Sequence, residues 1–171
     1  KSIAASPMQF TTSSKVFTQE EAILNSSQGS TDAAGRLGVR IARFCWPTLR
    51  MTTEGGSADR QGTDGYSFGL FGDQRVQIKF DKRMALSGNI FHEIYEKSKY
   101  HPERPWRASP HRATWYIFTT VGFAWLIPTD VLAQTEVNMT LARISKTAIG
   151  FLIPETSISS FGCERKEHHI R

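Results

Sequence analysis

Three polar side chains near the middle of the chain have types and a spacing that suit the hydrolysis of a phosphodiester bond. Gln77 lies thirteen residues after Asp64, and Lys79 lies two positions further on. A carboxylate and an amide oxygen can bind a hard cation such as Mg²⁺ or Mn²⁺, which neutralises phosphate charge and activates water. A lysine beside them can orient or deprotonate that water, or stabilise the developing charge. The three residues therefore predict a metal-assisted hydrolytic site, with Asp64 and Gln77 at the metal and Lys79 at the attacking water.

A predicted β-hairpin would bring these residues to one face of a sheet. Residues 64–71 and 74–81 both alternate, and Gly72-Asp73 between them is typical of a hairpin turn. With the turn centred there, the numbers of paired residues sum to about 145. Because opposite residues share a face, four side chains then point to the same side: Asp64, Gln77, Lys79 and Asp81. A slip of one residue would break this arrangement.

The residues around the hairpin resemble those of the PD-(D/E)XK nuclease superfamily. Asp64 followed by Gln77-Ile78-Lys79 at a strand end is similar to its pattern, with Gln77 in place of the usual acid and Thr63 where the name has Pro. Across about residues 62–134, the order of landmarks resembles that of small phage and prophage members; these landmarks are QIKFD, SGN, IFHEIYE, WRASPHRATWYIF and WLIPTDVL. The resemblance implies a restriction-endonuclease-like fold, shared with Holliday-junction resolvases. It also implies DNA as substrate, Mg²⁺ or Mn²⁺ as cofactor, and a homodimer.

Three further carboxylates are candidates to complete the metal site. The family often adds an acidic residue from an N-terminal helix, and Glu21, in a helix expected over residues 18–25, could supply it. The alternative role of Glu21 is to complete a capping box with Thr18. Asp81 shares the predicted face of the hairpin, and Glu93 lies in the segment that follows the SGN landmark.

A basic, proline-broken loop over residues 97–112 is the candidate DNA-binding segment. Lysine and arginine neutralise phosphates, and a serine can donate to a phosphate oxygen. The resemblance places this loop beside the active face, whereas the composition alone is equally consistent with a solvated loop. The candidate DNA-binding residues, including two that follow the catalytic strand, are Lys82, Arg83, Arg104, Arg107, Ser109 and Arg112.

Two other functions stay open at this point. The same fold could be a catalytically inactive nucleic-acid-binding module, because Gln77 removes one charge from the metal site. Residues 65–69 (GYSFG) also match the G-x-S-x-G nucleophile elbow of serine hydrolases, with Ser67 as nucleophile. That motif needs a strand before it and a helix after it, and here another strand is expected to follow.

Length and composition limit the architecture that positions these residues. A chain of 171 residues suits one domain, and 39% hydrophobic and 22% charged residues are near the globular average. The formal net charge of +5 favours an anionic partner. Two cysteines cannot form a disulfide framework, which indicates a reducing, cytoplasmic setting. The longest apolar stretch is far shorter than a membrane span, so no membrane association is expected.

The expected fold is α/β, a single domain with a mixed, mostly antiparallel central sheet flanked by helices. Besides the hairpin, strands are expected over residues 90–96, 114–121, 123–127 and 147–153. A helix is favoured over a strand for residues 32–45, capped by Thr31 or Asp32, and a short helix is expected up to Gln134. Residues 47–63 are expected to be a loop. The expected organisation is a flexible arm over 1–15, the nuclease-like domain over 16–160 and a polar tail over 161–171.

Overall fold

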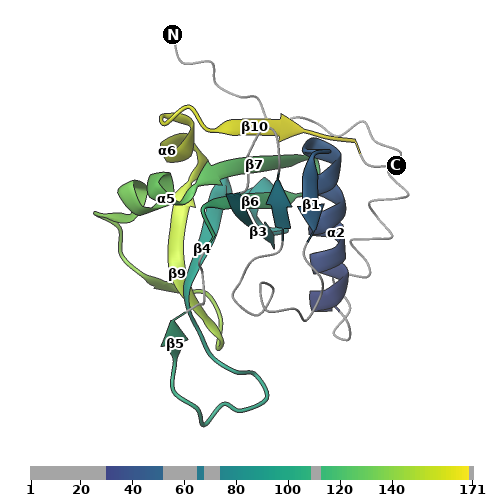
Figure 1. Ribbon diagram of the computed structural model, residues 1–171. Coiled ribbons are helices and arrows are strands. Elements are labelled where there is room, and N and C mark those ends of the chain that lie inside the picture. The colour runs from purple at the N-terminus through teal and green to yellow at the C-terminus, as the bar shows by residue number, and fades with distance from the viewer. Residues whose placement is uncertain (1–29, 52–64, 68–73, 109–112, 170–171) are drawn as a thin grey trace.

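The described part of the chain forms two sheets and four helices, stacked in three layers (Figure 1). The computed structural model describes residues 30–51, 65–67, 74–108 and 113–169. Helix α2 (Ser30–Cys45) is the first layer, a six-stranded sheet is the second and a four-stranded sheet with short helices is the third. The expected α/β class, with a mixed, mostly antiparallel sheet flanked by helices in a single domain, is confirmed. The separate four-stranded sheet was not expected.

The six-stranded sheet is mixed. Its strand order is β1 (Leu49–Met51), β2 (Gly65–Ser67), β3 (Gln74–Phe80), β6 (Trp115–Thr120), β7 (Phe123–Pro128) and β10 (Glu164–Glu167). All neighbouring strands are antiparallel except β3 and β6, which are parallel. β3, which carries Gln77 and Lys79, therefore has hydrogen-bonded strands on both sides.

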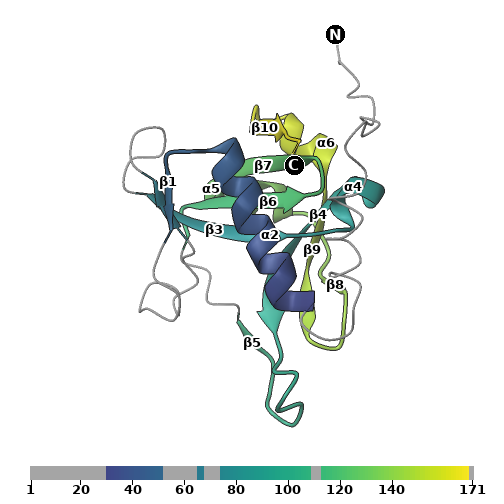
Figure 2. The ribbon, with the colours of Figure 1, turned by 90° about the vertical axis from the view of Figure 1, so that its right-hand side faces the viewer.

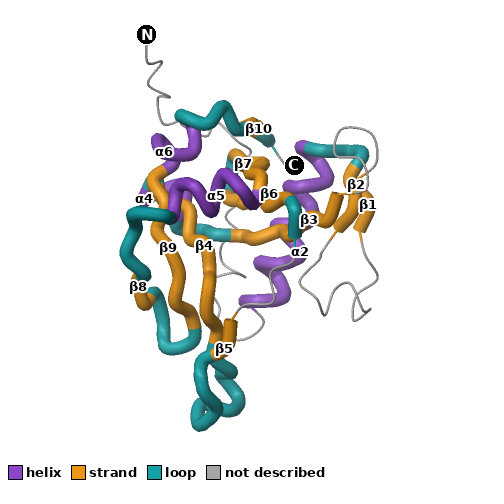
Figure 3. The backbone as a smooth tube through the Cα atoms, turned by 60° about the vertical axis from the view of Figure 1, so that its left-hand side comes forward, coloured by secondary structure: helices purple, strands orange, loops and turns teal. Residues whose placement is uncertain are grey.

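The four-stranded sheet is antiparallel and lies on the side of the six-stranded sheet away from α2 (Figures 1 and 3). Its order is β5 (Arg107–Ala108), β4 (Asn89–Glu96), β9 (Ala148–Pro154) and β8 (Ala142–Arg143). The short helices are α4 (Met84–Ser87), α5 (Thr129–Glu136) and α6 (Glu155–Ser159). Ile90 and Ile153 pack with Tyr116 and Phe118 in the apolar core between the sheets. No helix in the described ranges is long and apolar enough to cross a membrane.

Helix α2 forms because residues 32–45 carry an apolar stripe at helical spacing, so the helix favoured from the sequence is confirmed. Leu37 and Ile41 are buried in the core that this helix shares with strands of the six-stranded sheet, and Figure 2 shows α2 lying across that sheet. Gly38 allows the close approach, because a Cβ there would lie 3.0 Å from Thr119 Oγ1. The helix begins at Ser30, ahead of the two residues that were predicted to cap it.

Most expected strands are found with shifts of one or two residues at their ends. The predictions over 74–81, 90–96, 114–121, 123–127 and 147–153 correspond to β3, β4, β6, β7 and β9. The helix expected up to Gln134 is α5 and continues to Glu136. The arm over 1–15, the helix over 18–25 and the Gly72-Asp73 turn lie outside the described residues.

Two expectations about irregular segments were wrong. β1 lies inside the segment 47–63, which was expected to be a loop. The polar tail expected over 161–171 contains the edge strand β10, which pairs with β7. The reason is that cations of β10 cover aromatic rings: Arg165 lies 4.0 Å from the ring centroid of Phe123, and Lys166 lies 5.2 Å from that of Trp46. A strand that buries the stems of charged side chains has the composition of a solvated segment.

Replacing Gly150 by alanine is expected to lower the free energy of unfolding by about 2 kcal/mol, because overpacking must be relieved by backbone movement. A Cβ at Gly150 would overlap the carbonyl oxygen of His92 and lie 2.8 Å from its carbonyl carbon. Chemical denaturation of the variant measures the change. Gly35→Ala is the matched control, since a Cβ there meets nothing within 4 Å and alanine favours a helix interior. Equal stability of the two variants would contradict the prediction.

Candidate functional site

Gln77 and Lys79 lie on the same face of β3, the face turned away from α2. The residues between and beside them, Ile78 and Phe80, pack with the α2 core, and side chains alternate along a strand. The parallel register places Gln77 beside Tyr116 and Lys79 beside Phe118 on β6. The face of the predicted catalytic residues is therefore the one that meets the four-stranded sheet.

The Gln77 side chain is buried and incompletely hydrogen-bonded. Its exposed fraction is 7%, and its Oε1 atom has no hydrogen-bond partner among the described residues. Lys79, two positions further along the strand, is half-buried. A buried carbonyl oxygen without a hydrogen-bond partner destabilises the folded state. It therefore indicates a functional role or a bound group that supplies the missing contact. This oxygen is the atom that the sequence analysis proposed as a metal ligand.

The register of the β2–β3 hairpin differs from the expected one but keeps the expected faces. Gly65 pairs with Val76, and Ser67 pairs with Gln74, so paired numbers sum to 141 rather than about 145. The shift is an even number of residues, and only an odd shift moves side chains to the other face. Asp64 lies outside the described residues, as does Glu21. In the described hairpin, Gly65, which follows Asp64 in the chain, lies opposite Val76, which precedes Gln77.

Asp81 closes the turn between β3 and α4. Its Oδ1 accepts a hydrogen bond from the backbone N–H of Arg83 at 2.8 Å. Burial raises the pKa of the Asp81 carboxyl, against the opposing effect of the N–H groups that donate to it. The structure therefore gives Asp81 a local role that does not need a metal.

If the chain cleaves DNA with a metal as the sequence predicts, replacing Asp81 by asparagine is expected to leave the metal requirement within about twofold of the wild type, because the Asp81 side chain serves the turn and not a metal. Asparagine keeps an oxygen for the Arg83 N–H and removes the charge that burial disfavours. Asp81→Ala, which loses the acceptor, is expected to lower the free energy of unfolding by about 1 kcal/mol. Metal titration of cleavage and chemical denaturation test both. A tenfold rise in the Mg²⁺ requirement of a stable Asp81→Asn protein would instead identify a ligand.

Glu93 is not brought toward Gln77. His92, its neighbour on β4, lies against Tyr116 of the six-stranded sheet, with ring centroids 5.0 Å apart. Because side chains alternate, Glu93 points to the other face of β4. Within the described ranges no group of three or more His, Cys, Asp or Glu side chains could hold a metal ion.

The predicted DNA-binding residues fall into two groups at opposite ends of β4 (Figure 2). Lys82 and Arg83 are exposed in the turn that leads from β3 to α4. Arg104 and Arg107 are exposed beyond the other end of β4, where Arg107 forms a 2.6 Å ion pair with Glu96. Eight residues of strand separate the groups, which is roughly 26 Å at 3.3 Å per residue. Ser109 and Arg112 lie outside the described residues.

A buried polar cluster beside Gln77 was missed by the sequence analysis. His92 Nδ1 is hydrogen-bonded to Glu136 Oε1 at the end of α5, and both side chains are largely buried. Burial, with a smaller contribution from the Glu136 carboxylate, raises the pKa of the Tyr116 phenol. Tyr116 is the register partner of Gln77. An imidazole, a carboxylate and a phenol thus share the interior that Gln77 faces. No sequence signal pointed to the pair, because 44 residues separate its members.

The serine-hydrolase alternative is not supported by the position of Ser67. Ser67 is the last residue of strand β2 and pairs with residues of both neighbouring strands, Leu49 and Gln74. A nucleophile elbow requires a turn from a strand into a helix at the serine. The next element after Ser67 among the described residues is strand β3, so this part of the chain does not supply the helix that the motif needs.

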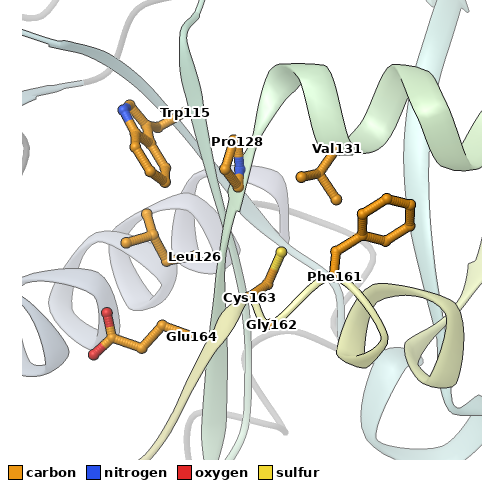
Figure 4. A pocket seen from close by; sticks show the side chains of 8 residues that line it. All are labelled: Trp115, Leu126, Pro128, Val131, Phe161, Gly162, Cys163 and Glu164. Atoms are coloured by element: carbon orange, nitrogen blue, oxygen red, sulfur yellow. The ribbon is translucent and has the colours of Figure 1, made fainter.

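A pocket of about 260 Å³ lies elsewhere, between the six-stranded sheet and the segment that follows α6 (Figure 4). Its lining residues are Trp115, Leu126, Pro128, Val131, Phe161, Gly162, Cys163 and Glu164. None of them belongs to the predicted site. Burial raises the pKa of the Cys163 thiol, which disfavours the reactive thiolate.

Comparison with known proteins adds no family to this geometry. No protein-family model, no curated protein and no solved structure matches the chain. The resemblance to PD-(D/E)XK nucleases, carried by residues 62–134, therefore stays a prediction.

Proposed function

We propose that the chain is a metal-dependent endonuclease of the PD-(D/E)XK type, which hydrolyses DNA phosphodiester bonds. The observation that carries the proposal is the Gln77 Oε1 atom, buried without a hydrogen-bond partner among the described residues, on the same face of a central strand as Lys79. A hard cation is a suitable partner for a carbonyl oxygen in this position. The donor at Gln77 thus fits the predicted cofactor, Mg²⁺ or Mn²⁺.

Each residue has a defined part in the proposed reaction. Gln77 Oε1 and the carboxylate of Asp64 would hold the cation, which supplies charge neutralisation and a more acidic water. Lys79 would orient the attacking water through its ammonium group and offset the negative charge that develops on the phosphate. The β2–β3 pairing of Gly65 with Val76 supports this grouping, because these are the chain neighbours of Asp64 and Gln77.

DNA, the cellular setting and the oligomeric state belong to the same proposal. Lys82 and Arg83, exposed in the turn after β3, would contact the DNA backbone near the reacting phosphate. Cys45 and Cys163 are free thiols, which supports the cytoplasmic, intracellular setting that we propose. The homodimer implied by the resemblance stays a prediction.

A cleavage assay on labelled linear duplex and four-way-junction DNA tests the proposal. We expect cutting with Mg²⁺ or Mn²⁺ and none with EDTA, and the preferred DNA separates a restriction-like role from that of a junction resolvase. If neither DNA is cut with either metal, the proposed nuclease function is wrong. If the protein then still binds DNA in a salt-sensitive way, the catalytically inactive binding module becomes the preferred function.

A further inference from the structure

Two loops that are distant in sequence meet at the end of the four-stranded sheet farthest from α4 (Figures 2 and 3). One is the β4–β5 loop, residues 97–106, and the other is the β8–β9 loop, residues 144–147. The backbone N–H of Lys97 donates to the carbonyl oxygen of Thr147 at 2.9 Å, next to the Glu96–Ala148 pair of β4 and β9. This end of the molecule, which we call the β4–β5 tip, is therefore one surface built from both loops.

A tryptophan fixes two cations at the tip. Lys97 Nζ lies 5.9 Å and the Arg143 guanidinium carbon 5.5 Å from the centroid of the Trp106 ring. Arg143 also donates from Nε to the carbonyl oxygen of Ser145 at 3.3 Å. These contacts hold Lys97, from the β4–β5 loop, and Arg143, the last residue of β8, near the same ring, although like charges repel. An anion bound between them would offset the repulsion.

The charge of the tip is strongly positive. Six cationic residues lie in or beside the two loops, namely Lys97, Lys99, Arg104, Arg107, Arg143 and Lys146. The acidic residues in the same segments are Glu96 and Glu103, and each is engaged, with Arg107 at 2.6 Å and with His101 at 3.3 Å. A polyanion is the complementary partner for such a surface.

An aromatic ring stands exposed among these cations. Tyr100 has an exposed fraction of 78%, and Lys99 Nζ lies 5.0 Å from the centroid of its ring. The ring contributes little to any core, so packing does not explain it. An exposed aromatic side chain next to a cation, in a segment rich in lysine and arginine, suits single-stranded nucleic acid, because an unpaired base can stack on the ring while phosphates contact the cations. Duplex bases are already stacked on each other and gain nothing from the ring.

We propose that the β4–β5 tip binds single-stranded DNA, with Tyr100 stacking on a base and with Lys97 and Arg143 contacting phosphates. The choice of DNA over RNA rests on the proposed nuclease function, whereas the preference for an unpaired strand rests on the tip itself. At roughly 26 Å from the turn after β3, the tip would hold a strand that extends beyond the cleavage site. It would thus favour substrates with an unpaired arm or end.

The test is fluorescence anisotropy of the 171-residue chain in EDTA, with labelled single-stranded DNA, the duplex of the same sequence and the matching RNA. Tyr100→Ala is expected to weaken single-strand binding about tenfold and duplex binding less than twofold. Tyr100→Phe, which keeps the ring, is expected to restore the affinity. Arg143→Ala should reduce the slope of log K against log salt by about 0.7 for the single strand. Arg43→Ala, an exposed cation near the end of α2, is the control that should change neither.

Equal single-strand affinity of wild type and Tyr100→Ala would overturn the proposal, as would tighter binding of duplex than of single strand by the wild type. Tighter binding of RNA than of DNA would overturn the assignment to DNA. Since EDTA removes cleavage, this assay does not depend on the nuclease site. If the protein cuts DNA but wild type and Tyr100→Ala bind single-stranded DNA equally well, only the proposed role of the tip is refuted. If Tyr100→Ala weakens single-strand binding but the wild type does not cut DNA, only the proposed nuclease function is refuted.

Discussion

Replacing Lys79 by alanine is expected to lower metal-dependent DNA cleavage at least about a hundredfold, which is the usual loss when a positioned proton-transfer or charge-stabilising group is removed. The side chain is half-buried and projects from the same face of β3 as Gln77, the proposed metal ligand, two positions away along the strand. The loss should appear mainly in kcat rather than in KM, because the interaction is made with charge that develops in the transition state. Cleavage of the two DNA substrates at saturating Mg²⁺ measures it.

The controls for Lys79→Ala separate chemistry from folding and from general charge. Lys79→Met keeps the length of the side chain and should be equally inactive, and Arg43→Ala removes one positive charge from α2 and should cut normally. DNA binding in EDTA should change little in all three variants. Full metal-dependent cleavage by Lys79→Ala would place the reaction elsewhere and contradict the proposed site.

The shared face of Gln77 and Lys79, which the sequence predicted, depends on alternation along one strand. Gln77 and Lys79 are two positions apart, so they share a face of β3 whatever the strand pairs with. This is why the prediction tolerated a wrong register: sums of about 145 would place residue 66 opposite Lys79, whereas in the structure Tyr66 pairs with Arg75. The local pattern likewise predicted helix α2, because an apolar stripe at helical spacing is typical of an amphipathic helix.

The part that the sequence could not predict depends on contacts between distant segments. Local sequence patterns do not determine which strands pair. The parallel pairing of β3 with β6 and the division of the strands between two sheets depend on how the two hydrophobic cores pack. The sequence of the edge strand β10, ERKE, has no apolar residue and therefore predicts a polar tail rather than a strand. The hydrogen bond of Asp81 depends on the turn after β3, and the direction of the Glu93 side chain depends on how β4 packs. Both are features of tertiary structure.

Removal of the Glu136 carboxylate is expected to have the largest effect on stability among the substitutions considered. Glu136→Ala should lower the free energy of unfolding by about 3 kcal/mol, the lower end of the range for removing one partner of a buried pair. The reason is that His92 Nδ1 loses an acceptor in an interior formed by Tyr116 and Phe118, where water does not replace it. Urea denaturation of the variant measures the change.

Matched variants show whether the loss of stability in Glu136→Ala comes from the His92–Glu136 pair or from helix α5 alone. Gln134→Ala changes an exposed position of the same helix and should cost less than about 0.5 kcal/mol. The double variant His92→Phe with Glu136→Leu keeps a ring against Tyr116 and leaves neither polar group buried. It should be more stable than Glu136→Ala, because apolar replacement of a buried pair is often neutral. If the double variant were the less stable of the two, the pair itself would not be the source of the loss. Glu136 would then act through packing of α5 against the four-stranded sheet.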